Sequence, residues 1–405
     1  MKKHALILTL ALALAALAQT GLAASVQAQT HWARSWSASP LAAAPDRRPP
    51  TLKDVTVRQV VRVSAGGDRF RLRLTNEYGP TAVRIGRVRI VQLADDGAPV
   101  PGTARDLTFD GAASALLAPE APLLSDPVDL ALPALSRLSI SLYLPDEVAD
   151  PTIHLLGLSS AWIAHGDQTA AAALTDPTLV TQRLLISGVD VERAEAGRVI
   201  VTLGDSITDG ANGTRDADQR WPDLLARRLQ AAGLTSVAVA NAGISGNRIL
   251  KPKPGLGVAA LARFDRDVLA VPGVTDVIVL EGVNDFGMAW RDHDPQPPTP
   301  ADLIAGYRQM IARAHAAGLK IRLATILPFK DANYWSEQGE ATRQAVNAWI
   351  RTNAEADGVI DFDAVMRDAT EPLKLAAAYD SGDHLHPNDA GFRAMADAID
   401  LTPYR

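Results

Sequence analysis

The chain has 405 residues, of which 47% are hydrophobic and 21% charged, and its formal net charge is −6. This is a globular composition, and the length predicts two domains rather than one. The acidic balance argues against a nucleic acid or an anionic membrane as a partner, because either would favour a basic patch. The sequence contains no cysteine, which excludes disulfides, a cysteine nucleophile and a thiolate metal site.

The first 28 residues have the pattern of a secretory signal peptide. Two lysines give a basic start, and residues 5–18 form an apolar run interrupted only by Thr9. Residues 26–28 offer a small-residue cleavage site, and the run is too short to span a bilayer as a mature helix. We therefore expect an exported protein, periplasmic or secreted, with no membrane insertion after the signal is removed.

Residues 29–195 carry the signals of β-strands. Residues 56–63 are rich in β-branched side chains and largely alternate between apolar and polar positions, and residues 138–144 repeat this period of two. The pattern predicts an accessory domain, an antiparallel β-sandwich or jelly roll with one buried face. The arginines between the apolar positions are expected on the solvated face, with a charged ligand groove as the alternative.

From residue 196 onwards, short apolar runs alternate with helical patterns. Residues 199–203 suit a strand that is buried on both faces. Further strands are expected at residues 237–240, 277–280, 321–327 and 359–362, and helices at 221–232, 259–269, 301–317 and 337–354. Five β–α alternations predict an α/β domain over residues 196–405, with a flavodoxin-like, doubly wound parallel sheet. The active site of such a sheet lies at the carboxyl ends of its strands.

A serine follows the first of these strands, in the sequence Gly204-Asp205-Ser206. There it would occupy a strand-to-helix turn, where the helix amino terminus favours negative charge. The alternative is that Ser206 merely caps the helix. The glycine-flanked serine elbow of lipases is absent, so the usual α/β-hydrolase arrangement is not supported.

Near the carboxyl terminus, Asp383 and His386 are three residues apart in an expected loop. A serine nucleophile needs a base, and the base needs a carboxylate that orients it. In a turn, this spacing lets Asp383 reach one ring nitrogen of His386 while the other points at Ser206. A metal site formed by Asp380, Asp383, His384 and His386 is the alternative, but no further ligand cluster with metal spacing is visible.

Two more strand ends offer donors for an oxyanion. Gly246 follows the second strand of the sheet, and Asn284 follows the third. Acyl transfer places negative charge on the former carbonyl oxygen, and preorganised donors stabilise it. The backbone N–H groups of Ser206 and Gly246 and the side-chain amide of Asn284 are the expected oxyanion hole, although glycine and asparagine are also common in plain turns.

Aromatic residues follow the third and fourth strands and are expected at the rim of the cleft. These candidate substrate-binding residues are Phe286, Trp290, Tyr334 and Trp335. Stacking on sugar rings is one use for them, and packing that shields the site is the other. The proline-rich segment 292–300 is expected to be a loop, either a partial lid or a stiff connector.

These motifs resemble those of the SGNH (GDSL) hydrolase superfamily. The superfamily's four blocks correspond to residues 204–206, 244–246, 282–285 and 383–386, and the resemblance covers about residues 198–399. It implies a serine ester hydrolase without metal or cofactor. More specifically, residues 32–40, 58–79 and 263–267 resemble the branch of arylesterases and acylhydrolases that is associated with xylanases.

The resemblance implies a carboxylic ester hydrolase that removes small acyl groups, above all acetyl, from a small-molecule or oligosaccharide ester. Plant polysaccharides and aryl esters are the expected substrates. One alternative is a lysophospholipase or thioesterase on longer acyl chains, which would need a longer apolar channel. The other is a glycan-binding protein with a decayed hydrolase, against which the intact motif residues argue.

Overall fold

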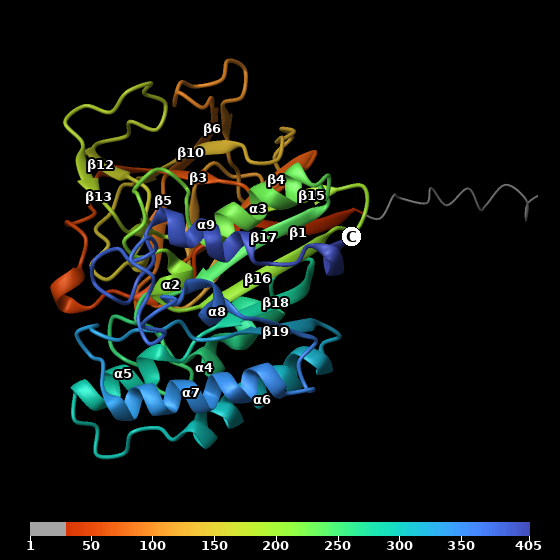
Figure 1. The fold of residues 1–405 in the computed structure, drawn as a ribbon. Coiled ribbons are helices and arrows are strands. Elements are labelled where there is room, and N and C mark those ends of the chain that lie inside the picture. The colour runs from red at the N-terminus through yellow and green to blue at the C-terminus, as the bar shows by residue number, and fades with distance from the viewer. Residues whose placement is uncertain (1–29) are drawn as a thin grey trace, which may run out of the picture.

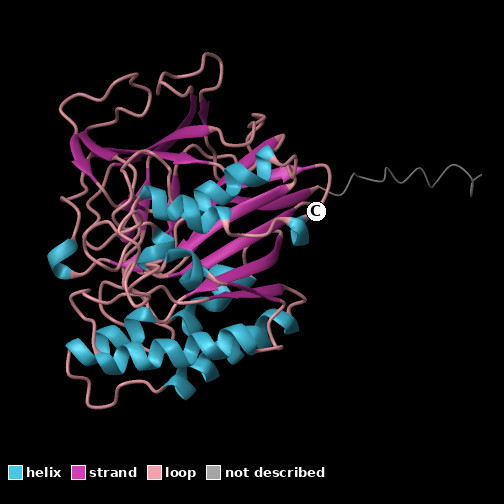
Figure 2. Cartoon of the chain, viewed as in Figure 1, coloured by secondary structure: helices cyan, strands magenta, loops and turns pink. Residues whose placement is uncertain are grey.

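The computed structural model describes residues 30–405, so the expected signal peptide at residues 1–28 lies outside the described residues. The described chain has a strand-rich antiparallel part and an α/β part around a parallel sheet (Figures 1 and 2). The last strand of the first part ends at Arg193, and the first strand of the second begins at Arg198. The expected domain boundary between residues 195 and 196 lies in this connection and stays a prediction.

The strand-rich part is built from antiparallel sheets. A six-stranded sheet has the order β13-β12-β3-β10-β6-β7, a four-stranded sheet the order β1-β15-β4-β9, and β14-β11-β2 and β5-β8 form smaller sheets. The bounds are β1 (His31–Ser37), β2 (Leu41–Ala42), β3 (Val55–Arg62), β4 (Arg69–Thr75), β5 (Val83–Ile85), β6 (Arg87–Leu93), β7 (Arg105–Asp106), β8 (Ala115–Leu117), β9 (Pro122–Leu124), β10 (Arg137–Leu144), β11 (Thr152–His154), β12 (Ala161–His165), β13 (Thr178–Val180), β14 (Arg183–Leu184) and β15 (Ile186–Arg193), with a short 3₁₀ helix η1 (Pro45–Arg47) after β2. A β-rich amino-terminal part is thus confirmed, and its finer classification as a sandwich or jelly roll stays a prediction.

Strand β4 shows where the alternating arginines lie. Its apolar side chains are buried, whereas Arg69 and Arg71 between them are partly exposed. Both arginines pair with carboxylates of the neighbouring strand β15: Arg69 with Glu192 and Arg71 with Asp190, each at 3.1 Å. The β4 arginines therefore lie on the partly exposed face of the strand, where they pair with carboxylates of β15.

The α/β part has a parallel sheet with the order β17-β16-β18-β19-β20. The first strand of the sheet therefore lies between the second and the third, which is the flavodoxin order. The strands are β16 (Arg198–Gly204), β17 (Val237–Gly243), β18 (Val274–Leu280), β19 (Lys320–Ala324) and β20 (Gly358–Ile360), and the helices are α2 (Ser206–Asp209), α3 (Trp221–Ala231), α4 (Ala260–Phe264), α5 (Val283–Arg291), α6 (Pro300–Ala316), α7 (Glu337–Thr352), α8 (Phe362–Met366) and α9 (Asp389–Asp397). A π-helical turn η2 (Asp265–Leu269) follows α4, and a 3₁₀ turn η3 (Thr402–Tyr404) lies at the carboxyl terminus.

Helices cover both faces of this sheet, as Figure 1 shows for α3 and α9 on one side and α6 and α7 on the other. Alternate residues of β16 enter different cores: Ile200 belongs to one cluster of buried side chains, and Val201 to the other. The first cluster includes side chains of α3, α8 and α9, and the second includes side chains of α4, α6 and α7. The expected doubly wound arrangement is confirmed.

The structure differs from the expected elements in several places, among them the strand expected at 359–362, which ends at Ile360 before the unexpected helix α8 begins at Phe362. The helix expected at residues 259–269 is the short α4 followed by the π-helical turn η2, and the strand expected at 321–327 ends at Ala324. Helix α5 was not expected, because nine residues are too few to establish a helical period in the sequence. This helix carries Asn284, Phe286 and Trp290, so its rotation decides where those side chains point.

One of the two hydrophobic cores contains side chains from both parts of the chain. The larger cluster of buried side chains contains residues of the antiparallel sheets and of the parallel sheet. Strand β1 lies close to β17, and the Ser37 hydroxyl donates a hydrogen bond to the Asn241 carbonyl at 2.8 Å. Within residues 30–405, the structure has no helix with both the length and the apolar character to cross a membrane.

Candidate active site

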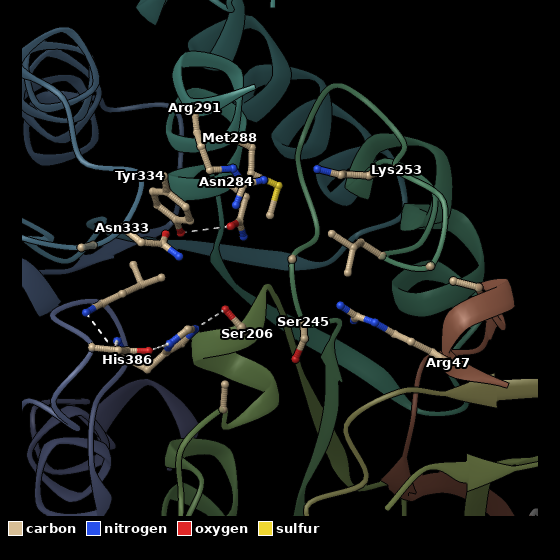
Figure 3. A pocket seen from close by; sticks show the side chains of 18 of the residues that line it. Arg47, Ser206, Ser245, Lys253, Asn284, Met288, Arg291, Asn333, Tyr334 and His386 are labelled. Atoms are coloured by element: carbon tan, nitrogen blue, oxygen red, sulfur yellow. Dashed lines mark hydrogen bonds and ion pairs between the residues drawn. The ribbon is translucent and has the colours of Figure 1, made fainter. Parts of the chain in front are cut away.

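Ser206 lies at the carboxyl end of β16, where the sequence places it. Asp205 directly follows the strand and caps helix α2, because its side chain accepts a hydrogen bond from the Ile207 N–H at 2.9 Å. Ser206 is therefore the first residue of a short helix, with its hydroxyl directed towards the loop that carries His386 (Figure 3). A cap of this kind fixes the backbone at Ser206 and hence the direction of its side chain.

A continuous chain of hydrogen bonds joins Ser206, His386 and Asp383. His386 Nε2 lies 2.8 Å from Ser206 Oγ, and His386 Nδ1 lies 2.6 Å from Asp383 Oδ2. A carboxylate can only accept, so Nδ1 carries the proton and Nε2 accepts from the serine hydroxyl. This is the protonation that a general base needs before it removes a proton from Ser206.

The Asp383 carboxylate is held by its own loop. Its Oδ1 atom accepts the backbone N–H groups of Leu385 and His386 at 3.1 and 2.8 Å, and Oδ2 also accepts from the Asn212 amide at 2.9 Å. Partial burial opposes its charge, but the hydrogen bonds from the side chain and backbone of His386 hold the pKa of Asp383 well below its usual range. Asp383 is thus ionised and oriented before any substrate binds.

Gly246 and Asn284 face the same cleft as Ser206. Gly246 has a φ of 78°, and a Cβ there would approach the Leu256 side chain to 2.6 Å, so this turn requires glycine. The Asn284 Nδ2 atom donates to the Asn247 carbonyl at 3.0 Å, while its Oδ1 accepts from the Tyr334 hydroxyl at 3.1 Å. This leaves one N–H of the amide free to serve an oxyanion.

The cleft has a volume of about 710 Å³. Three cationic side chains line it: Arg47 of η1, Lys253 and Arg291 (Figure 3). Lys253 and Arg291 both pair with Asp292, at 2.8 and 2.7 Å. Arg47 comes from the strand-rich part, so both parts of the chain build this cleft. No local pattern in the sequence predicts that Arg47 lines the cleft, because η1 reaches the cleft only through the packing of the two parts.

Of the four aromatic side chains expected at the rim, only Tyr334 lines the cleft. Phe286 is fully buried and packs against Phe329, with 5.6 Å between ring centroids. Trp335 packs partly buried against the core, and Trp290 is exposed but does not line the cleft. The expectation for Phe286, Trp290 and Trp335 is therefore wrong, because residues that follow a strand in the sequence can lie on any side of the helix or loop that they enter.

Buried carboxyl groups lie close to the site residues in the sequence, namely those of Asp205, Glu281 and Asp285. Burial raises the pKa of Asp205 to about 7, and that of Asp285 to about 6. Burial, reinforced by the nearby Asp205 carboxylate, also raises the pKa of Glu281 well above its usual value. Among residues 30–405, no three His, Asp or Glu side chains gather as a metal site. Asp380 and His384, the other two residues of the metal alternative, bind each other at 2.7 Å.

A parallel sheet in the flavodoxin order, with a serine–histidine–aspartate chain at its carboxyl end, defines an SGNH-type hydrolase. Residues 202–394 match the sequence model of the GDSL-like lipase/acylhydrolase family, and this segment of the chain belongs to that family. The protein is accordingly a hydrolase that acts on esters. No curated protein sequence matches the chain.

Solved structures with a similar fold include a lipase/acylhydrolase from Enterococcus faecalis, which is 23% identical and has a TM-score of 0.38. The alignment covers 50% of this chain and 93% of that protein. An acetyl xylan esterase, AlAXEase, is 21% identical with a TM-score of 0.37, over 49% of this chain and 96% of its own. TesA is 25% identical with a TM-score of 0.37, over 51% and 99%.

Proposed function

We propose that the protein is an exported serine esterase in which Ser206 is the nucleophile, His386 the general base and Asp383 the residue that orients it. The observation that carries this proposal is the hydrogen-bonded chain from Ser206 Oγ through the His386 ring to Asp383. It lies in a cleft that Gly246 and Asn284 also line. The backbone N–H groups of Ser206 and Gly246 and the free N–H of Asn284 form the oxyanion hole.

In the first half of the reaction, Ser206 Oγ bonds to the ester carbonyl carbon and its proton moves to His386 Nε2. The negative charge on the carbonyl oxygen is stabilised by the oxyanion hole. The bond to the alcohol then breaks, and the leaving oxygen takes the proton from His386. An acyl group remains on Ser206.

In the second half, water attacks the acyl carbon and gives a proton to His386 Nε2. The bond between Ser206 Oγ and the acyl carbon breaks, Ser206 recovers the proton, and the carboxylic acid leaves. Asp383 stabilises the imidazolium in both halves without taking the proton. No step uses a metal or a cofactor.

We expect Ser206→Ala to lower kcat for p-nitrophenyl acetate by on the order of 10³-fold or more. Labelling by a fluorophosphonate probe should be lost with it. Ser114→Ala, at an exposed serine of the strand-rich part, is the control and should retain both. A Ser206→Ala protein that keeps most of its activity would refute the assignment.

The proposed substrates are esters of small acyl groups, above all acetyl, on plant polysaccharide fragments or aryl alcohols. Charged and polar side chains such as Arg47, Lys253 and Asn284 line the cleft beside apolar ones such as Leu256 and Met288, so the cleft offers polar contacts for a sugar alcohol and apolar contacts for a short acyl group. The structurally similar AlAXEase is described as an acetyl xylan esterase. Export, to the periplasm or outside the cell, agrees with a polysaccharide substrate.

A series of p-nitrophenyl esters from acetate to laurate tests the acyl part of this proposal. We expect kcat/KM to be highest for acetate and to fall as the chain grows. A maximum at eight carbons or more would instead favour a lysophospholipase or thioesterase. Release of acetate from acetylated xylan, compared with other acetylated glycans, tests the alcohol part.

A further inference from the structure

A buried chain of polar groups connects the strand-rich part to the loop that carries Gly246. His154, the last residue of β11, is 4% exposed, and its Nε2 atom lies 2.9 Å from Asp209 Oδ1. The other oxygen of Asp209 accepts two hydrogen bonds from Ser245, from the backbone N–H at 2.8 Å and from the hydroxyl at 2.7 Å. Ser245 directly precedes Gly246, and Asp209 ends the helix that Ser206 begins.

The hydrogen bonds of His154 determine its charge. Nδ1 lies 3.0 Å from the Ser39 carbonyl, and Nε2 faces the Leu156 carbonyl at 3.1 Å as well as Asp209. All of these oxygens only accept, and a neutral imidazole has a single N–H. The doubly protonated ring is therefore the form that satisfies both nitrogens.

The surroundings of His154 agree with a cation there. Burial opposes the charged ring, but the Asp209 carboxylate and its hydrogen bond raise the pKa of His154 above the usual value. Arg183 and Arg220 border the same small cavity as His154 and Asp209. Arg220 lowers the pKa of His154, but it is itself paired with Asp223 at 2.7 Å.

A buried ion pair is stable only when both partners are present, because removal of one leaves the charge of the other without compensation. Without His154, the Asp209 carboxylate would keep only its bonds to Ser245 and would be drawn towards other cations or water. Ser245 would move with it, and the N–H of Gly246 would turn. Oxyanion donors act through their exact placement, so a small rotation lowers the rate without abolishing substrate binding.

We propose that His154 is a positioning residue of the esterase, which acts through Asp209 and Ser245 on the Gly246 N–H of the oxyanion hole. The strand-rich part then completes the active site of the α/β part. This inference rests on the proposed function, in which Gly246 stabilises the oxyanion.

The test measures kcat and KM for p-nitrophenyl acetate, with the number of competent sites counted by fluorophosphonate labelling at completion. For His154→Gln we expect kcat per labelled site to fall about 10-fold, less than the loss of a whole oxyanion donor, with KM little changed. The matched control is His165→Gln, which alters an exposed histidine of the same part that lies 3.5 Å from Asp54. It should leave kcat unchanged.

A double-variant cycle shows whether His154 acts through Asp209. Because the two residues belong to one series of hydrogen bonds, the double variant His154→Gln, Asp209→Asn should have a kcat only slightly below that of the worse single variant. Ser245→Ala, which removes only the hydroxyl donor, should give a smaller loss of kcat in the same direction. This milder variant retains a readout if the others fold poorly.

The inference is overturned if His154→Gln reduces only the number of labelled sites while kcat per site stays at the wild-type value, since that is the result of a purely structural role. It is also overturned if the losses from His154→Gln and Asp209→Asn multiply. Either outcome leaves the proposed function intact, provided that Ser206→Ala is inactive. An active Ser206→Ala protein would instead remove the proposed function itself.

Discussion

The amide of Asn284 is held at both of its ends. The Tyr334 hydroxyl donates to its oxygen, and its nitrogen donates to the Asn247 carbonyl. Because a carbonyl oxygen only accepts, the nitrogen of the amide cannot exchange places with the oxygen. A donor that is fixed in this way needs no reorganisation when charge develops on a substrate oxygen.

Replacement of this donor should affect catalysis more than binding. We expect Asn284→Ala to lower kcat by about 10²- to 10³-fold, the usual effect of the loss of one oxyanion donor. Tyr334→Phe removes only the bond that orients the amide and should cost less. Steady-state kinetics with p-nitrophenyl acetate would check both, and equal kcat values for Asn284→Ala and the wild type would exclude this amide from the oxyanion hole.

Among the secondary-structure elements, helix α4 fastens the ends of two strands through one side chain. Arg263 is buried and donates to the carbonyls of Gly204 and Ala242, the residues at or near the ends of β16 and β17, at 3.0 and 2.6 Å. It also lies 3.0 Å from Asp267 and 3.4 Å from Glu281. The Gly204 carbonyl also accepts the Ile244 N–H at 3.0 Å, so Arg263 adds a second donor to it and links the ends of the two strands.

Replacement of Arg263 by an apolar residue of similar length should therefore destabilise the fold. We expect Arg263→Met to lower the free energy of unfolding by about 3 kcal/mol or more, because it removes a buried cation that donates to two strand-end carbonyls and to the buried Glu281 carboxyl. The matched control is Arg308→Met, which breaks an exposed pair with Glu355 and should cost about 1 kcal/mol or less. Urea denaturation followed by tryptophan fluorescence would compare the two, and equal losses would contradict the role given to Arg263.

The protein as a whole contains two sets of titrating groups with opposite effects on stability. Asp267 and Asp357, near cationic partners, have pKa values lowered to about 2, so their stabilisation is lost as the pH falls from about 4 towards 2. Asp205 and Asp285 have raised values of about 7 and 6. Between about pH 4 and 7 these two carboxyl groups stay protonated in the folded protein but are ionised in the unfolded chain. The stabilisation that they give at lower pH is therefore lost as the pH rises through this range.

The sum of these effects predicts a maximum of stability at mildly acidic pH, on the order of 4 to 5. The charged form of His154 adds to the decline at higher pH, because its raised pKa stabilises the fold below about 6.5 and is lost above its folded value. Urea midpoints measured between pH 4 and 8 should fall with increasing pH. Asp205→Asn, which can still cap α2, should make that decline shallower, whereas an unchanged slope would contradict the assigned shift.

Local signals in the sequence were sufficient to predict that Ser206, Asp383 and His386 lie close together. The aspartate and histidine hydrogen-bond within a single turn, and the carboxyl ends of parallel strands converge whatever the details of packing. The same rule brought Gly246 and Asn284 to one cleft with the serine. For these residues, hydrophobic period and spacing carried the relevant information.

Tertiary packing alone decided the remaining features. Phe286 turned inward because the hydrophobic core set the rotation of a nine-residue helix. Arg47 reached the cleft, and His154 reached Asp209 across 55 positions of the chain, because the antiparallel sheets pack against the parallel one. Contacts between distant segments depend on how whole elements are oriented, and no local period or spacing encodes that orientation.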